Sequence, residues 1–155
     1  ILKAEQVDDE FHARFDATRR TYLYRILNRK SPPALNLGRV WHVADELDLS
    51  IMQQAANLLT GKHDFTSFRA SICQAKSPIK TLDILTVTKK QDELHIIAEA
   101  RSFLHHQVRN LTGTLVDMGR KKRDPNNIKD ILAAKDRAAA GITAPPDGLY
   151  LTGVF

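Results

Sequence analysis

The stretch from Leu104 to Met118 has helical spacing and brings an arginine together with histidines, which are residues that bind anions and move protons. At 3.6 residues per turn, Arg109 shares a face with His105, Thr112 and Val116. That mixture is unusual both for a face in a core and for a face in open solvent. A guanidinium in a cleft can hold an anion by two parallel hydrogen bonds, whereas a surface arginine only buries its stem. Spacing alone leaves both interpretations of Arg109 open.

Two tyrosines follow a pair of arginines near the start of the chain. Tyr22 and Tyr24 share one face of a strand predicted from Thr21 to Arg29, because side chains alternate along a strand. Paired tyrosines on a strand usually pack in the core, but a functional tyrosine could stack on a base or transfer a proton. RNA-binding grooves combine basic residues for phosphates with rings for bases.

The histidine pairs do not have the spacing of a metal site. Neither His63 with Asp64 nor His105 with His106 has a His partner four residues away or a clear third ligand. Phosphate-binding glycine loops and the nucleophile elbow of hydrolases are also absent from the sequence. Cys73 is the single cysteine, which excludes an internal disulfide and suits a small buried side chain in a reducing cytoplasm. We therefore expect no metal and no cofactor.

The chain is basic, with 23 Lys and Arg against 18 Asp and Glu and a formal net charge of +5. A modest positive excess is compatible with a polyanionic partner, although clustered charges often form only a solvated face. The basic residues gather in two places, near the start of the chain and just after the helix of Leu104 to Met118. The candidate RNA-binding residues are Arg14, Arg19, Arg20, Lys121, Lys122 and Arg123.

The length and composition predict one globular domain. The chain has 155 residues, 43% of them hydrophobic, which is ordinary for a packed core. It has no apolar run of about 18 residues, as a transmembrane helix requires. It does not begin with Met, so we expect it to be part of a longer protein, with residues 1–10 as a connector from an upstream domain.

The remaining elements follow from periodicity and from turn residues. Short strands are expected over Arg39 to Val43 and Gly148 to Phe155, and a hairpin over Lys80 to Lys89 and Glu93 to Ala100. A polar loop is expected from Lys62 to Arg69. Ser50 is expected to cap a helix that runs to Thr60, and Asp124 a helix that runs to Lys135, with one more turn over Asp136 to Ala140. Without regular strand–helix alternation, the fold class is α+β, a mainly antiparallel sheet covered by helices.

Several stretches together resemble the tRNA pseudouridine synthase A family. They occur in the order of the family and extend over nearly the whole chain. One such stretch alone would be weak evidence, whereas the complete ordered set is specific. The stretches are Phe11 to Ala17, Arg19 to Ile26, Gly61 to Arg69, Ser102 to Leu111 and Thr143 to Leu151.

The resemblance implies a pseudouridine synthase-like half and a role for individual residues. Tyr22 matches the active-site tyrosine of the family, and Arg109 matches the arginine that pairs with the catalytic aspartate. Leu149 matches an apolar residue of the uracil pocket, while Phe68 and Arg69 belong to the active-site loop and are candidate substrate-binding residues. We therefore expect Tyr22, Arg109 and Leu149 to converge on one cleft.

The chain departs from the family pattern by lacking the catalytic aspartate. In the family this residue lies in the N-terminal half, and no aspartate of this sequence has the matching context. The resemblance thus implies that residues 1–155 are the C-terminal domain of a longer synthase, inactive alone, with Arg109 in an open cleft. The full protein is expected to convert uridine to pseudouridine at around positions 38 to 40 of the tRNA anticodon stem-loop, after the base leaves its stack.

The resemblance also implies partners and a location. The partner is tRNA, the full-length protein is expected to be a cytoplasmic homodimer, and no membrane is involved. Two alternatives remain open: a non-catalytic RNA-binding module whose Tyr and Arg residues only grip the nucleic acid, and a His-based ribonuclease, which would cleave RNA.

Overall fold

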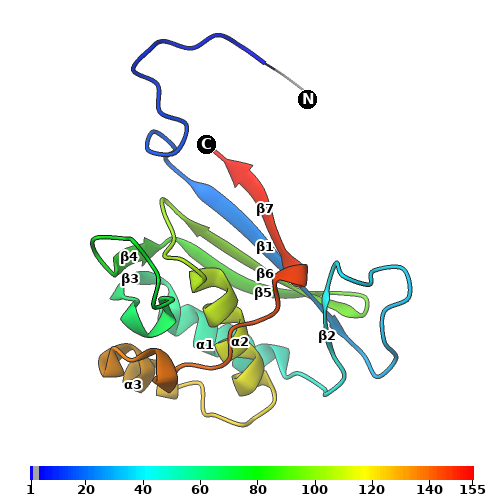
Figure 1. Cartoon of the computed structure of the whole chain (residues 1–155). Helices are drawn as coiled ribbons and strands as arrows, with labels where there is room; N and C mark the ends of the chain where they lie inside the picture. Colours follow the sequence, from blue (N-terminus) through cyan, green and yellow to red (C-terminus); the bar gives the residue numbers. More distant parts are fainter. Residues whose placement is uncertain (2–3) are drawn as a thin grey trace.

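A five-stranded sheet forms the frame of the protein in this computed structural model, which describes residue 1 and residues 4–155 (Figure 1). Its strands are paired antiparallel, except that β1 and β2 run parallel. The chain thus has the expected α+β class with a mainly antiparallel sheet. The five strands are β1 (Arg20–Asn28), β2 (Trp41–Val43), β5 (Ile84–Lys90), β6 (Glu93–Ala100) and β7 (Leu149–Val154).

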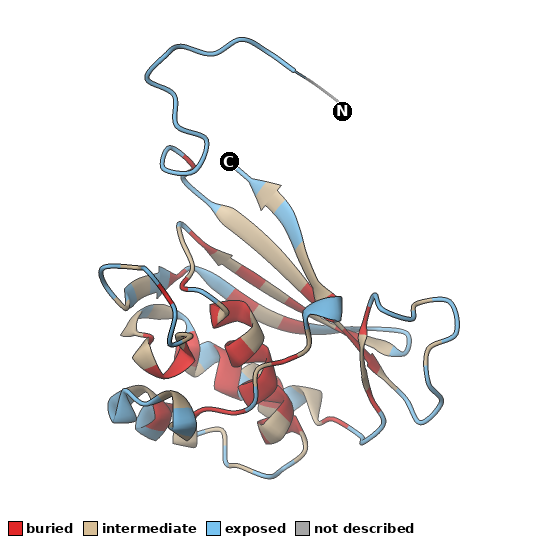
Figure 2. Cartoon of the chain, viewed as in Figure 1, coloured by how far each residue is buried: buried red, intermediate tan, exposed pale blue. Residues whose placement is uncertain are grey.

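Two helices pack on one face of this sheet, and a third packs against the first of them. They are α1 (Leu49–Leu59), α2 (Gln107–Gly119) and α3 (Asn127–Ala134). Along β6 buried residues alternate with half-buried ones, and the buried set faces the helices because successive side chains point to opposite faces. Figure 2 shows the buried residues gathered where α1 and α2 meet the sheet. Among the described residues, no helix has both the length and the apolar character that a bilayer crossing requires.

The helix boundaries correct several expectations. Asp48, not Ser50, caps α1: its carboxylate accepts the N–H groups of Ser50 at 3.1 Å and Ile51 at 3.2 Å. The helix also ends one residue early, because Thr60 is already extended. The expected start of α2 at Leu104 is wrong as well, since His106 has a left-handed φ of 61° and the helix begins after it.

A second, small sheet pairs β3 (Gly61–Asp64) with β4 (Ile79–Leu82). The sequence predicted a loop from Lys62 to Arg69, and that prediction is wrong for the residues that form β3. It also predicted one continuous strand over Lys80 to Lys89, but the strand breaks at Asp83, whose N–H donates to the carbonyl of Glu99 at 2.8 Å. Before the break β4 pairs with β3, and after it β5 forms the expected hairpin with β6.

Near the C-terminus, Asp124 accepts the N–H of Asn126 at 2.7 Å but α3 begins only at Asn127, later than predicted. The short turn expected over Asp136 to Ala140 is a 3-10 turn, Arg137–Ala139. The segment that follows returns the chain past α2 to β7, along the edge of the sheet (Figure 1).

Candidate active site

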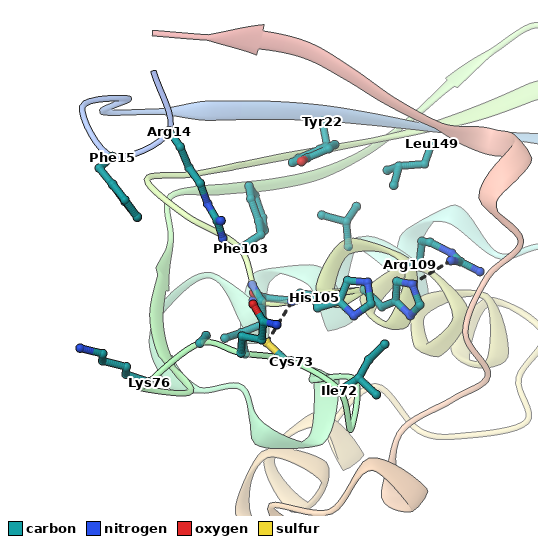
Figure 3. Close-up of a pocket in the computed structure, with 16 residues that line it drawn as sticks. Arg14, Phe15, Tyr22, Ile72, Cys73, Lys76, Phe103, His105, Arg109 and Leu149 are labelled. Atoms are coloured by element: carbon teal, nitrogen blue, oxygen red, sulfur yellow. Dashed lines mark hydrogen bonds between the residues drawn. The ribbon is translucent and has the colours of Figure 1, made fainter. Parts of the chain in front are cut away.

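A cleft of about 980 Å³ opens between β1, the start of α2 and the loop of residues 72–76. In Figure 3, Tyr22 and Leu149 hang from the strands on one side of it, while His105 and Arg109 come from the helical side. Tyr22, Arg109 and Leu149, which lie far apart in the sequence, all line this cleft. The structure therefore brings together the three residues whose convergence was expected.

Tyr22 reaches the cleft from the inner face of β1. In the sheet it lies opposite Ala98 of β6 and Leu151 of β7. Its ring meets that of Phe103 edge-on, with the centroids 5.2 Å apart and the planes at 87°, an arrangement favoured by aromatic quadrupoles. No described residue hydrogen-bonds its hydroxyl group, so the backbone and Phe103 fix the ring while the phenolic oxygen keeps its bonding capacity for a ligand.

Arg109 is half-buried on the first turns of α2 and has two fixed contacts. Its Nε donates to the carbonyl of Ala144 at 2.6 Å, and its Nη1 lies 3.3 Å from Nε2 of His106. Ala144 in turn donates its N–H to the carbonyl of Arg109 at 3.2 Å. The guanidinium is therefore held through Nε and Nη1, and no described residue accepts from its remaining N–H groups.

Close packing brings the Ala144 carbonyl to Arg109. Gly113 permits this approach, since a Cβ on it would lie 1.8 Å from the carbonyl oxygen of Ile142. The buried side chain of Asn110 ties the same segment to the helix: its Oδ1 accepts from Thr143 at 2.7 Å and from Arg137 at 3.1 Å. Its Nδ2 donates to the carbonyl of Phe68 at 2.8 Å. Asn110 thus joins α2 to the segments of Phe68, Arg137 and Thr143, one residue after Arg109.

The cleft is rich in cations. Arg14, Lys76 and Arg109 line it, and no acidic residue does so among the residues that the structure describes. The rings of His105 and His106 stack with centroids 3.9 Å apart. Partial burial lowers the pKa of His106, and the nearby His105 and Arg109 lower it further. At neutral pH the cleft is therefore a positive site in which His106 is uncharged.

Cys73 lies at the floor of the cleft and is nearly buried, as the sequence predicted. Burial opposes ionisation of the thiol, but hydrogen bonds from the N–H groups of Ala75 and His105, together with Arg69, outweigh it and lower its pKa. The sulfur thus bonds the cleft loop to the residues before α2.

Phe68 and Arg69 lie beneath the cleft rather than on its surface. The Phe68 side chain is 0% exposed and packs in the core. Arg69 donates to the carbonyls of Cys73 at 2.6 Å and Ala75 at 3.0 Å, which shapes the cleft loop. Contact of either residue with substrate stays a prediction, and in this structure both support the residues that line the cleft.

The two groups of predicted RNA-binding residues lie apart. Arg14, Arg19 and Arg20 are near the start of β1, whereas Lys121, Lys122 and Arg123 follow the far end of α2 (Figure 1). Of the six, only Arg14 lines the cleft. Arg20 donates to the carbonyls of Arg14 and Arg101, and the Arg19 guanidinium lies 4.1 Å from the ring centre of Phe155. They therefore form no single continuous surface, and their contact with RNA stays a prediction.

The model of the tRNA pseudouridine synthase family matches residues 55–155, the larger part of the chain. The chain belongs to the tRNA pseudouridine synthase family. Relatives named tRNA pseudouridine synthase A include those of Caulobacter sp. (strain K31), 55% identical, and Rhodospirillum rubrum, 54% identical, each over 99% of this chain. Another, from Bartonella tribocorum, is 51% identical over 99% of the chain. The resemblance deduced from the sequence is thereby confirmed.

This member of the family spans only part of its curated relatives, 62% of the Caulobacter protein and 55% of the Rhodospirillum protein. Among its described residues, no group of histidine, cysteine and acidic side chains could hold a metal ion.

The sequence did not single out three features around Arg109: His106 as its partner, Asn110 as an anchor, and the carbonyl of Ala144. Asn110 could have been recognised from the sequence, because a polar residue beside the apolar stripe of a helix is either exposed to solvent or fully hydrogen-bonded.

Proposed function

We propose that this chain is the C-terminal part of a tRNA pseudouridine synthase A, with residues 1–10 as a connector from an N-terminal part. Residues 2–3 of this connector lie outside the residues that the structure describes. The proposal rests on one observation: Tyr22, Arg109 and Leu149 share a cleft whose described lining has cations and no acid. Such a cleft is complementary to a carboxylate and to RNA.

The chemistry assigned to each residue follows from its position. An aspartate from the N-terminal part would start the reaction, and Arg109 would hold it ionised and oriented, because a nearby opposite charge favours the charged form. Tyr22 would meet the flipped uracil at the distance of a proton transfer, and Leu149 would form an apolar wall beside it. The glycosidic bond breaks, the uracil turns, and a carbon–carbon bond forms. Neither a metal nor a cofactor enters this scheme.

The substrate in this proposal is the anticodon stem-loop of tRNA, with uridines at around positions 38 to 40 that are flipped out of the stack. Arg14 and Lys76 at the cleft would contact phosphates, since such contacts supply most sequence-independent affinity. We further propose that the complete protein is a cytoplasmic homodimer, as the resemblance implies.

The test is to measure pseudouridine formation in tRNA by the full-length protein, by residues 1–155 alone, and by residues 1–155 mixed with the N-terminal part. Activity is expected only where the N-terminal part is present. Tyr22→Phe and Arg109→Ala should each slow it by on the order of 10²-fold or more. If both variants keep the full rate and only bind tRNA less tightly, the chain is an RNA-binding module instead.

A further inference from the structure

Arg109 is held between two acceptors that come from different parts of the chain. On one side the Ala144 carbonyl accepts from Nε at 2.6 Å, and on the other Nε2 of His106 lies 3.3 Å from Nη1. We propose that His106 is a positioning residue that fixes the Arg109 guanidinium by accepting this hydrogen bond, and that it does so only as a neutral imidazole. The inference rests on the function proposed above, because it concerns how the arginine meets its carboxylate.

The backbone aims His106 at Arg109. His106 has a φ of 61°, in the left-handed region that residues other than glycine rarely adopt. It stands directly before α2, and the first turn closes over it, with the N–H of Asn110 donating to its carbonyl at 2.9 Å. An unfavourable conformation persists only where the surroundings impose it, and such positions cluster at functional sites. Here the conformation places the ring one helical turn before Arg109.

The chemistry of the pair fixes the protonation state. A guanidinium only donates, so the Nε2 of His106 must offer a lone pair, and the ring proton must be on Nδ1. Protonation of the ring would remove the acceptor and place a second positive charge beside Arg109. The hydrogen bond between His106 and Arg109 therefore forms only while the imidazole ring is neutral.

No acid in the described lining of the cleft stabilises a protonated His106. The titratable and charged groups that line the cleft with His106 are His105 and Arg109 on its own segment, Cys73 and Lys76 on the cleft loop, Tyr22 on β1, and Arg14. Partial burial, His105 and Arg109 all lower the pKa of His106 below its usual value. The ring thus remains an acceptor at neutral pH and loses that role in acid.

The first experiment measures kcat and KM for pseudouridine formation by the full-length protein from about pH 5 to about pH 8, the range in which histidines titrate. His106→Ala should lower kcat by on the order of 10- to 100-fold with little change in KM, because a misplaced arginine impairs the reaction and not tRNA binding. His106→Gln supplies an amide oxygen with similar reach that does not titrate. The chain already places a glutamine, Gln91, at a φ of 54°.

His106→Gln should therefore keep most of kcat and lose the fall in rate that the wild type shows in acid. The matched control is His105→Gln, which changes the neighbouring ring. It should keep the acid fall and move it to higher pH, since His105 lowers the pKa of His106. An acid fall that is unchanged in His106→Gln, or a wild-type kcat in His106→Ala, would overturn the proposal.

Arg109→Ala in the same assay separates the two proposals. If it keeps full activity, the proposed function fails. If it abolishes activity while His106→Ala does not, only the positioning role fails. Should His106→Ala unfold, a pH titration of the Arg109 Nη–H resonances in the full-length wild type decides, because Nη1 is the atom that faces His106. A resonance that follows the ionisation of His106 supports the bond, and one that stays constant through that ionisation rules it out.

Discussion

The two ends of α2 both carry basic residues, yet the structure uses them differently. After the far end, Nε of Arg120 lies 2.8 Å from Oδ2 of Asp45, and Nζ of Lys121 lies 3.4 Å from Oδ2 of Asp48. At the cleft end, Arg109 has a carbonyl and a histidine as partners, and no described acidic residue lines the cleft. Two of the charges at the far end are paired with acids of the domain, whereas the cations of the cleft have no described acid beside them in its lining.

The difference shows what a cluster of charges in a sequence means. The run from Arg120 to Arg123 has the greater charge density, but its contacts tie the end of α2 to neighbouring segments. Arg123, for example, donates to the carbonyl of Ala139 at 2.5 Å. Arg109 is isolated in the sequence and nevertheless lines the cleft, where the Ala144 carbonyl and His106 hold its guanidinium. A basic cluster is therefore structural or functional according to whether acidic residues lie close enough to pair with it, and not according to how many cations it contains.

The largest effect on the rate is expected when the arginine at the cleft end of α2 is removed. Arg109→Ala in the full-length protein should slow pseudouridine formation by on the order of 10²- to 10³-fold, as for other preorganised donors that meet developing or fixed charge. The control is Arg120→Ala at the opposite end, which should keep the rate and cost less than about 1 kcal/mol of stability, because the Asp45 carboxylate is exposed.

Single-turnover assays and urea unfolding measure both quantities. Equal losses of rate in Arg109→Ala and Arg120→Ala would mean that both ends of α2 serve the same purpose, and the contrast between them would disappear.

A second contrast lies on β1, where Tyr22 and Tyr24 share one face. Tyr24 is fully buried, its hydroxyl donates to the carbonyl of Pro145 at 2.6 Å, and burial raises its pKa. Tyr22→Phe should lower the rate by on the order of 10²-fold, in the range of general acid–base catalysis, with stability unchanged. Tyr24→Phe should keep the rate and cost about 1 kcal/mol, because it leaves the partly buried carbonyl of Pro145 without its donor.

Thermal unfolding combined with a rate assay separates the two tyrosines. A catalytic loss in Tyr24→Phe comparable to that in Tyr22→Phe would show that the strand geometry, and not the Tyr22 hydroxyl, matters.

The sequence predicted much of this arrangement. Alternation placed Tyr22 and Tyr24 on one strand face, and helical spacing gave Arg109 a mixed face that suits a cleft. The apolar stripe of α2, with Leu111 and Leu115, is buried as that spacing requires. Local periodicity determines which residues share a face, and the resemblance supplied the positions that converge.

What the sequence could not predict depends on contacts between distant segments. The break at Asp83 is made by the carbonyl of Glu99, which lies on the next strand. The left-handed backbone at His106 has no glycine to signal it, and the Ala144 carbonyl offers no side chain to recognise. Backbone acceptors and strained residues are set by tertiary packing and have no residue-type signature.

A smaller effect is expected on RNA affinity. Lys76→Glu at the cleft should weaken tRNA binding by on the order of 10-fold and reduce the salt slope by about 1, if Lys76 contacts a phosphate. Lys122→Glu, an exposed residue at the opposite end, is expected to have a smaller effect, because that end lies away from the cleft. Filter binding at several salt concentrations measures both, and a larger loss for Lys122→Glu would make the far end the main RNA-binding surface.

The smallest effect should come from an ion pair at the far end. The N–H of Ile51 lowers the pKa of Asp48, and Lys121 lowers it further, so the carboxylate is charged and paired at neutral pH. Lys121→Gln should lower the melting temperature of the full-length protein by at most about 3 °C at low salt, and by less at 1 M salt, where exposed pairs are screened. Lys122→Gln is the matched control, since no described acidic residue pairs with Lys122, and its melting temperature should match the wild type at both salt concentrations. A decrease for Lys121→Gln that persists at high salt would show that the lysine stem, and not its charge, stabilises the end of α2.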